Sequence, residues 1–462
     1  MNKNRDDALN NLVAEYENIS KQGLAVFLDE KAYQQLIDYY ESEGLPEKAL
    51  EVAGRAIQHY SFSVDFYLRQ ANLLIETHRE HEALNVLEHA ANFSPGELEI
   101  ELLRAEAFIY LDQTDTALAI LDACKAGAEG HDLSDILLVE AVLFEQEEAY
   151  ERMFISLRAA LDLWPENEEA LEKMWLATEL SKQYEESVRF HETLLEDYPY
   201  AYLAWYNLAH AHACLGNYDE AIEAYEFAFS INDQFEFAYR DCAELCFELQ
   251  QYGKALRLYL EMQEQFDPEG ETLLRIGQCF QHLGKYDEAK EYFVKAIHID
   301  PMDDEAHFCL GQCWAEKGNW KSAIRCYQKA IHIEDGREEY YLGMAEALEQ
   351  TGDLTGAAFY FKASLEIAPE EKDLWLRYIT FLLDTGQFEE ALKCSEEAIT
   401  FDLGAELIYS QAACLLRLGR RQEALYWLGE ALLEDYEAHG VLFSLVPALT
   451  VDPDVANLIA AR

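Results

Sequence analysis

The sequence predicts an all-α protein, a solenoid of stacked antiparallel helix pairs. Three observations lead to this fold class. A set of residues recurs every 34 positions, and apolar residues recur at helical spacing between them. Proline and glycine, at 9 and 22 of 462 residues, are too sparse for a turn-rich all-β fold. Half of the residues are hydrophobic, which excludes a disordered acidic chain. A folded chain of this length holds about three ordinary domains or one long repeat array.

The repeat is clearest in the second half of the chain. Residues 295–301 (KAIHIDP) and 329–335 (KAIHIED) match at an offset of 34. The same offset relates Gly277 to Gly311. Small and aromatic residues keep the same relative places in the neighbouring segments, namely Trp205, Ala209, Gly216, Ala221, Ala289, Ala323, Ala357, Trp375, Gly386 and Ala391.

This pattern resembles the tetratricopeptide repeat (TPR), which has aromatic residues at positions 4 and 24, small residues at 8, 20 and 27, and a glycine near 15. Aligned in this way, the chain holds twelve repeats over residues 30–438, divergent over 30–201 and near the consensus over 202–438. The resemblance implies that the helix pairs wind into a right-handed superhelix. The repeats start near residues 30, 64, 98, 134, 168, 202, 236, 270, 304, 338, 372 and 405.

Each part of the repeat has a physical role. Two stretches of about 12–14 residues carry apolar residues at i, i+3, i+4 and i+7, which predicts two amphipathic helices. Small residues let the helix backbones approach closely, and glycine or a polar residue closes the turn between them. One pair cannot bury its apolar face alone, so stacking is required. Prolines should end the second helices, at Pro95, Pro165, Pro199, Pro301 and Pro369.

The phase of the pattern is open over residues 98–201. The third repeat is 36 residues long because of the loop at 127–132. In the fifth repeat, Trp175 stands where a small residue is expected, so its phase could be off by two.

Both ends depart from the repeat. We expect residues 1–29 to hold an N-terminal capping helix that starts at Asp6. Residues 439–462 are rich in apolar residues, and their last helix should have Asp452 as N-cap and Pro453 in its first turn. This C-terminal tail either covers the apolar face of the last repeat or docks on a partner or a second copy of the chain.

The chain carries 35 basic and 89 acidic side chains, a net charge of −54. Such a surface repels nucleic acid and anionic membranes, so we expect neither as a partner. The charge either keeps a large helical protein soluble or attracts a basic partner. The first residues lack the apolar segment of a secretory signal, and no run of about 18 apolar residues could span a membrane. The ten cysteines are scattered along the chain, unlike those of a disulfide framework. We therefore expect a cytoplasmic location.

We find no motif typical of proteases, nucleotide-binding loops or calcium loops, so we expect no catalytic residue, cofactor or metal. Two cysteine pairs, Cys242 with Cys246 and Cys309 with Cys313, each lie one helical turn apart, and His307 is nearby. Such pairs could bind zinc or sense redox state. The resemblance gives Cys242 and Cys246 core positions, so we expect the pairs to pack in the core.

The resemblance implies that the first helix of each repeat lines a concave groove that holds extended peptides or short helices. Arginine side chains there could bind a carboxylate of the ligand, and amides could bind its backbone. Alternatively, the arginines only neutralise neighbouring acids. The carboxylate clamp of the chaperone-binding members is broken, because only one of its five residues matches. The candidate groove residues are Tyr206, Asn207, His210, Arg240, Asp241, Arg275, Gln278, His282, Gln312 and Arg377.

We therefore predict a non-enzymatic interaction scaffold or adaptor that binds peptide segments of partner proteins in the groove. The alternative is an acidic holding chaperone or assembly factor for a basic client, whose binding would weaken as salt rises. A third hypothesis is an enzyme whose site forms across repeats, for example from His210 and His282 near Asp241. Self-association through the apolar end faces is also open.

Overall fold

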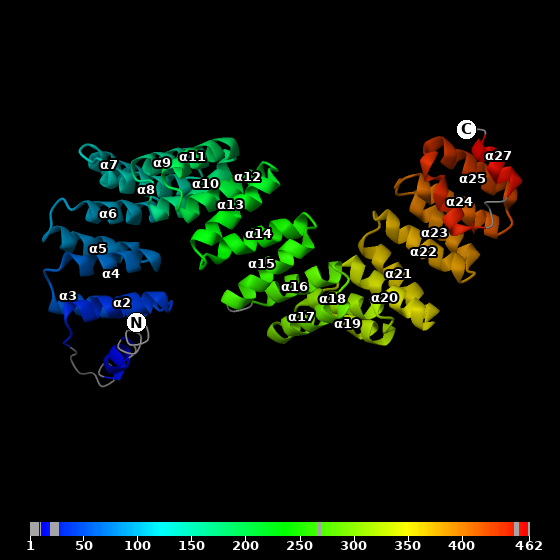
Figure 1. The fold of residues 1–462 in the computed structure, drawn as a ribbon, viewed down its shortest axis with the longest axis horizontal. Coiled ribbons are helices and arrows are strands. Elements are labelled where there is room, and N and C mark those ends of the chain that lie inside the picture. The colour runs from blue at the N-terminus through cyan, green and yellow to red at the C-terminus, as the bar shows by residue number, and fades with distance from the viewer. Residues whose placement is uncertain (1–8, 10, 19–26, 267–268, 448–451, 461–462) are drawn as a thin grey trace. The chain divides into compact units, whose positions relative to one another are not determined.

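The computed structural model describes residues 9, 11–18, 27–266, 269–447 and 452–460 (Figure 1). All regular structure among these residues is helical, as the sequence predicts. The chain forms two compact units, Met1–Cys242 and Ala243–Arg462, whose boundary lies within helix α14 (Glu236–Glu248). This boundary differs from the predicted change in repeat type at 201/202, because that prediction compared sequences, whereas the units are defined by packing.

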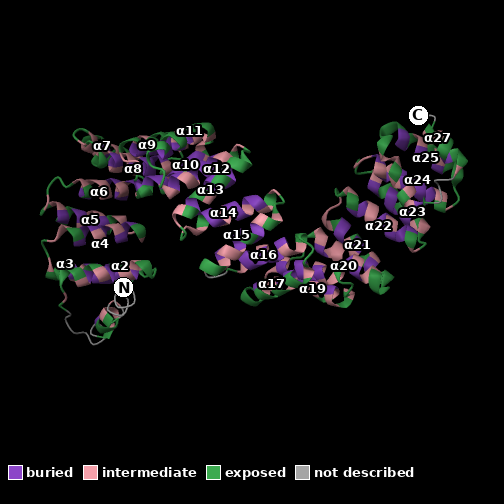
Figure 2. Cartoon of the chain, viewed as in Figure 1, coloured by how far each residue is buried: buried purple, intermediate pink, exposed green. Residues whose placement is uncertain are grey.

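The first unit is a stack of antiparallel helix pairs, in which each second helix follows its first helix after a short turn (Figure 1). Buried residues follow the faces between the helices, and exposed residues follow the outer faces (Figure 2). Its described pairs are α2 (Glu30–Ser42) with α3 (Pro46–His59), α4 (Val64–Glu76) with α5 (Glu80–Ala91), α6 (Leu98–Tyr110) with α7 (Thr114–Lys125), α8 (His131–Gln146) with α9 (Tyr150–Leu163), α10 (Glu168–Ser181) with α11 (Tyr184–Asp197) and α12 (Tyr202–Cys214) with α13 (Tyr218–Ile231).

The second unit continues the same architecture. After α15 (Tyr252–Gln265), its pairs are α16 (Gly270–His282) with α17 (Tyr286–Ile299), α18 (Asp304–Glu316) with α19 (Trp320–Ile333), α20 (Glu338–Thr351) with α21 (Leu354–Ile367), α22 (Lys372–Asp384) with α23 (Phe388–Ile399) and α24 (Ala405–Arg417) with α25 (Arg421–Glu434). Three short helices follow, η1 (Glu437–His439), α26 (Gly440–Leu445) and α27 (Pro453–Ala460).

Every first helix except α8 begins at the residue where the aligned repeat begins. Helix α8 begins at His131, three residues earlier than the predicted start at 134. Gly130, the residue before it, takes a left-handed backbone with φ +58°, and the His131 ring stacks on Trp164 with centroids 4.5 Å apart. This stacking accompanies an extra first turn of α8 that the repeat pattern does not contain. The phase counted from 134 still holds, because Ala141 and Ala160, at positions 8 and 27, are buried.

The fifth repeat keeps its phase in spite of Trp175. Helix α10 buries Met174 and Ala177, and the Trp175 side chain turns outward, 39% exposed. Helices α10 and α11 contact each other less than the helices of the other described pairs in this unit. Polar side chains of Thr178 and Ser187 are buried between them, joined by a hydrogen bond of 3.1 Å. A large residue at the close-approach position therefore loosens the pair without shifting its register.

Close approach of the two helices in a pair depends on glycine at two places. A Cβ atom on Gly277 would lie 2.6 Å from the Phe293 ring, and one on Gly311 would lie 2.6 Å from the Tyr327 ring. Both distances are shorter than any real carbon contact, so an aromatic ring of the second helix occupies the place of the missing side chain.

Both ends add apolar cover to the stacks. Near the N-terminus, Leu9 and residues 11–18 are helical and Tyr16 is buried in the first core cluster. The other residues of the predicted capping helix, including Asp6, lie outside the described residues. At the C-terminus, Leu442 and Val455 pack into a core cluster with helices α24 and α25. Asp452 caps α27 as predicted, because its Oδ1 accepts hydrogen bonds from the backbone of the first turn at 3.0 and 3.3 Å.

The glycine contacts give a stability prediction. Gly311→Ala should destabilise the second unit by about 1–3 kcal/mol, because the new methyl group must displace the buried Tyr327 ring. Gly253→Ala in α15 is the matched control, since nothing lies within 4 Å of its Cβ position, and it should leave stability unchanged or raise it by up to about 1 kcal/mol. Urea unfolding followed by circular dichroism measures both, and equal midpoints for the two variants would contradict the packing argument.

Candidate functional site

The first helices form the inner side of each stack. In the first unit α4 contacts α6, α6 contacts α8 and α10 contacts α12, and in the second unit α16 contacts α18, α18 contacts α20 and α22 contacts α24. No two second helices make a comparable contact among the described residues. The repeats therefore converge on the side of the first helices, which we call the first-helix face. All ten candidate residues lie on first helices.

A pocket on this face of the second unit brings three of the candidates together. It has a volume of about 860 Å³ and is lined by His282, Gln312 and Arg377, from α16, α18 and α22. We call it the second-unit pocket. Its other walls combine aromatic and acidic side chains, among them Tyr286, Phe308, Trp320, Glu316, Glu339 and Glu346.

The three candidate arginines are all paired with acids of the chain itself. In the second unit, Arg377 forms ion pairs with Glu346 at 2.9 Å and with Glu349, and its guanidinium lies 5.2 Å from the centre of the Phe361 ring. Arg275 pairs with Glu244 at 3.1 Å. In the first unit, Arg240 pairs with Glu236 one turn away. The geometry therefore fits the alternative that these arginines neutralise neighbouring acids.

Two predicted ligand contacts are buried between repeats. The Asn207 amide donates a hydrogen bond of 2.8 Å to the carbonyl of Leu171, in the preceding first helix. The Gln278 amide donates one of 2.7 Å to Glu305, in the following first helix. Both side chains hold adjacent helices together, so their amide donors are not directed at a ligand.

The remaining candidates are held by their neighbours. In the first unit, the Tyr206 hydroxyl donates a hydrogen bond of 2.6 Å to Asp241, and burial with this carboxylate raises the pKa of Tyr206 well above its usual range. In the second unit, the His282 ring stacks on Tyr252 with centroids 4.1 Å apart, and burial lowers its pKa, which favours a neutral imidazole. Gln312 accepts a hydrogen bond of 2.8 Å from Gln281, so it stays at the pocket wall. The enzyme hypothesis combined His210 and His282 near Asp241. His210 and Asp241 belong to the first unit and His282 to the second.

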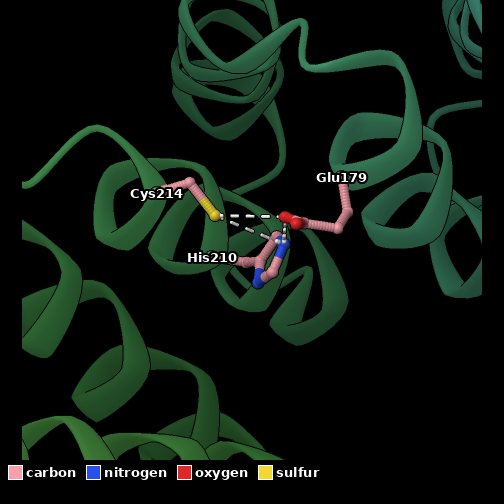
Figure 3. A group of neighbouring side chains, drawn as sticks. All are labelled: Glu179, His210 and Cys214. Atoms are coloured by element: carbon pink, nitrogen blue, oxygen red, sulfur yellow. Dashed lines mark hydrogen bonds and ion pairs between the residues drawn. The ribbon is translucent and has the colours of Figure 1, made fainter. Parts of the chain in front are cut away.

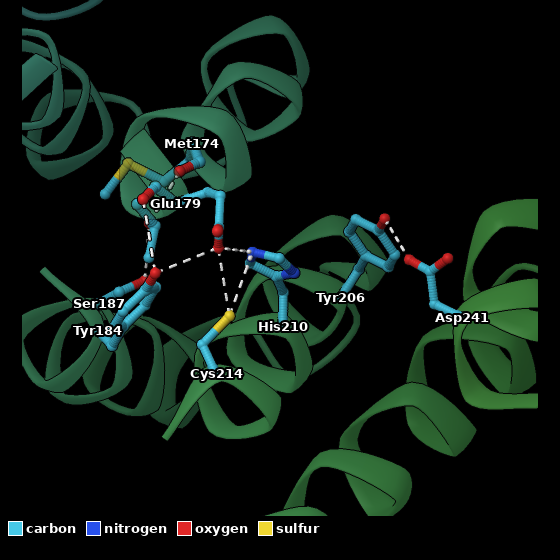
Figure 4. A network of polar contacts seen from close by, with 9 residues as sticks. Met174, Glu179, Tyr184, Ser187, Tyr206, His210, Cys214 and Asp241 are labelled. Atoms are coloured by element: carbon cyan, nitrogen blue, oxygen red, sulfur yellow. Dashed lines mark hydrogen bonds and ion pairs between the residues drawn. The ribbon is translucent and has the colours of Figure 1, made fainter. Parts of the chain in front are cut away.

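One group of side chains was missed by the sequence analysis. His210 Nε2 lies 3.1 Å from Glu179 Oε2, and Cys214 Sγ lies 3.3 Å from the same oxygen and 3.7 Å from His210 Nε2 (Figure 3). The Tyr184 hydroxyl donates to Glu179 at 3.3 Å, which joins α11 to the group (Figure 4). Among the described residues, it is the one cluster of three His, Cys, Asp or Glu side chains whose atoms could share a metal ion. The spacing of His210 and Cys214 gave a signal, but the glutamate comes from a different repeat.

The two cysteine pairs pack in the core, as expected. Cys242, Cys246, Cys309 and Cys313 are all buried. Burial raises the pKa of Cys309 and of Cys313 to about 12, so both remain protonated thiols near neutral pH.

Acidic side chains gather on the first-helix face of the first unit. Burial raises the pKa of Glu106 in α6 to about 7, and the charges of Glu169 in α10 and Glu76 in α4 add to this rise, while Lys173 opposes it. A partly buried carboxyl group among other acids is a site where a positive charge would be stabilised.

Tetratricopeptide repeat family models match half of the aligned repeats, all after residue 201. The tetratricopeptide repeat models match residues 202–235, 270–303, 304–336 and 332–444. The chain is a tetratricopeptide repeat protein. These matches single out no TPR subfamily. Such repeats are those of protein–protein interaction scaffolds. In this TPR protein, residues 45–132 also match the family model of the ChAPs (Chs5p-Arf1p-binding proteins).

Solved TPR structures resemble parts or all of the chain at low identity. MamA shares 21% identity over 35% of this chain and 94% of its own, with a TM-score of 0.34. YrrB, described as a TPR protein with an unusual peptide-binding site, shares 16% over 40% of this chain and 94% of its own, with a TM-score of 0.35. The APC/C hetero-tetramer Cut9-Hcn1 shares 13% over 94% of this chain and 96% of the other, with a TM-score of 0.37. No curated protein matches the chain.

None of the described helices of this TPR protein is both long enough and apolar enough to cross a bilayer.

The position of Glu106 gives a pH prediction. Because its folded pKa of about 7 lies above the unfolded value near 4.5, the folded state binds more protons, and stability is lost as pH rises through this window. Glu106→Gln removes the cost of ionisation, so it should stabilise the TPR protein by about 1–3 kcal/mol at pH 8 and by little at pH 4.5.

Urea unfolding at the two pH values measures this difference. Glu88→Gln is the matched control, because Glu88 is exposed on the second helix α5. A gain for Glu106→Gln that is equal at both pH values would show that the ionisation of this carboxyl group is not the cause.

Proposed function

We propose that the protein is an interaction scaffold that holds a basic, extended segment of its partner against the first-helix face. The second-unit pocket supports this proposal most directly. As a scaffold, the protein would bind without catalysing a reaction. Its ten free cysteines suit the reducing cytoplasm, where we propose that it acts.

The charges of the pocket favour a cation. Glu316, Glu339 and Glu346 line it, against the single arginine Arg377. The charge of Arg377 is already balanced by Glu346 and by a second carboxylate outside the pocket lining. An acidic ligand would have to break these ion pairs. A lysine or arginine of the ligand instead meets Glu316 and Glu339, and the one basic neighbour of Glu339, Arg337 at 3.8 Å, is shared with Glu305. The pocket therefore selects basic side chains.

The aromatic residues suit the same ligand. Trp320, Phe308 and Tyr286 line the pocket, and the face of an aromatic ring attracts a cation. Their rings also accommodate the methylene stems of lysine and arginine. Side-chain amides at the wall, such as those of Gln281 and Gln350, can bond the backbone of an extended peptide. The carboxylates, aromatic rings and amides of the pocket therefore all suit a ligand segment that is basic, extended and partly apolar.

The ChAPs match supplies a candidate partner for the first unit. Those proteins are named for binding Chs5p and Arf1p, and the match covers residues 45–132. It supports a protein partner rather than a small molecule. A protein related to Arf1p is therefore the first to test by direct binding to the purified chain.

Charge reversal in the pocket tests the proposal. Wild-type protein should bind a fluorescent peptide of alternating lysine and leucine, and bind the glutamate–leucine counterpart far more weakly. The double variant Glu316→Lys/Glu339→Lys should weaken binding of the lysine peptide by about tenfold or more, since each reversal replaces attraction by repulsion. Fluorescence anisotropy at physiological salt measures both affinities.

A matched control separates the pocket from the overall charge. Glu366→Lys/Glu397→Lys makes the same charge change at exposed positions of the second helices α21 and α23. It should change the affinity less than twofold. Equal losses in the two double variants would favour the alternative, a holding chaperone that attracts basic clients through its whole surface.

A further inference from the structure

We propose that Glu179, His210 and Cys214 bind a Zn²⁺ ion on the first-helix face of the first unit (Figure 3). Each side chain offers a ligand atom of a type that zinc accepts, a carboxylate oxygen, an imidazole nitrogen and a cysteine sulfur. The Cys214 thiol releases its proton to solvent when the ion binds. This site is separate from the second-unit pocket, so it does not depend on the proposed function.

The distances between the ligand atoms match a tetrahedral zinc site. With bond lengths of about 2.0–2.1 Å to nitrogen, 2.0–2.2 Å to oxygen and 2.3 Å to sulfur, tetrahedral ligand atoms lie about 3.4–3.6 Å apart. The observed separations are 3.1 Å for nitrogen and oxygen, 3.3 Å for sulfur and oxygen, and 3.7 Å for sulfur and nitrogen. An ion can therefore enter after shifts of a few tenths of an ångström.

The helices hold the three ligands in place. His210 and Cys214 lie four residues apart in α12, so their side chains leave the same face of one helix. Glu179 comes from α10, which packs directly on α12. The buried hydrogen bond from Asn207 to Leu171 ties the same two helices together. The site is thus built on two helices in fixed contact.

A second set of contacts orients the ligands. The Tyr184 hydroxyl donates to the oxygen of Glu179 that faces His210 and Cys214 (Figure 4). The Trp175 ring meets the His210 ring edge-on, with centroids 5.9 Å apart. Hydrogen bonds and packing around metal ligands fix their geometry and strengthen metal binding.

The ligand set selects among metals and leaves room for one more ligand. Magnesium and calcium prefer sites made of oxygen only, so a sulfur and an imidazole disfavour them. Cys214 is exposed, so solvent reaches the fourth coordination position. Three protein ligands with an open fourth position form a site that water or a ligating side chain of a partner completes. The ion would also tie α10 to α12 where α10 packs loosely against α11.

Metal titration of the full-length protein tests the site. The protein is reduced, stripped with a chelator, and titrated with Zn²⁺ against a chromophoric chelator, and then with Co²⁺ under an optical spectrometer. We expect one tight equivalent per chain, and for Co²⁺ a thiolate-to-metal charge-transfer band with the intense visible bands of a tetrahedral ion. Cys214→Ser should abolish the charge-transfer band, and His210→Gln and Glu179→Gln should each weaken Zn²⁺ binding by about tenfold or more.

Two control variants keep the result specific. Cys124→Ser removes another accessible thiol, and His212→Gln removes a second histidine of α12, and neither should change the stoichiometry or the cobalt spectrum. Circular dichroism melting of all variants without metal shows that they are folded. Weak binding of several ions with no charge-transfer band would mean that only surface carboxylates bind, and it would overturn the proposal, as would a tight site unaffected by all three ligand variants.

Discussion

The close approach of two helices at a small residue is the constraint on which the rest of the structure depends. At Gly277 and Gly311 an aromatic ring of the second helix fills the space that a methyl group would need. This contact sets the distance between the helices of a pair. It also constrains the repeat length. Each pair must present the same apolar face to the next pair, so the small and aromatic residues recur at a fixed spacing. In a stack of such pairs, the core runs along the stack, and the apolar side chains of each repeat contact only those of the adjacent repeats.

The same packing decides what the first-helix face can bind. Because the first helices crowd together, their polar side chains meet across repeats and satisfy one another. Arg377 reaches two glutamates of the preceding repeat, and Asn207 reaches the backbone of the preceding first helix. The chain has more than twice as many acids as bases, so the carboxylates left over outnumber the cations. This excess underlies the proposed preference of the face for a basic ligand, although its few arginines suggest an anion site when they are considered one at a time.

The sequence was sufficient for the fold and insufficient for the site, for a physical reason. Helix starts follow from a periodic pattern of small and aromatic residues, and this pattern failed only where a contact outside it intervened, as with His131 and Trp164. The position of a side chain on a first helix follows equally from the pattern. Its hydrogen-bond partner does not, because that partner lies about one repeat away and depends on side-chain length and rotamer. Glu179 and Cys214 are 35 residues apart, a separation that no local pattern reveals.

The fifth repeat shows why a solenoid can carry unusual chemistry without losing its fold. In a globular core, a tryptophan in place of a small residue would disturb packing throughout the domain. Here Trp175 turns outward, and the cost is confined to the contact between α10 and α11, because α10 still packs on α9 and α12. The outward ring then stands beside His210, and Glu179 is one turn further along α10. The fifth repeat thus departs from the repeat pattern at the same place where the proposed zinc ligands meet. The loss of packing there stays local to one helix pair.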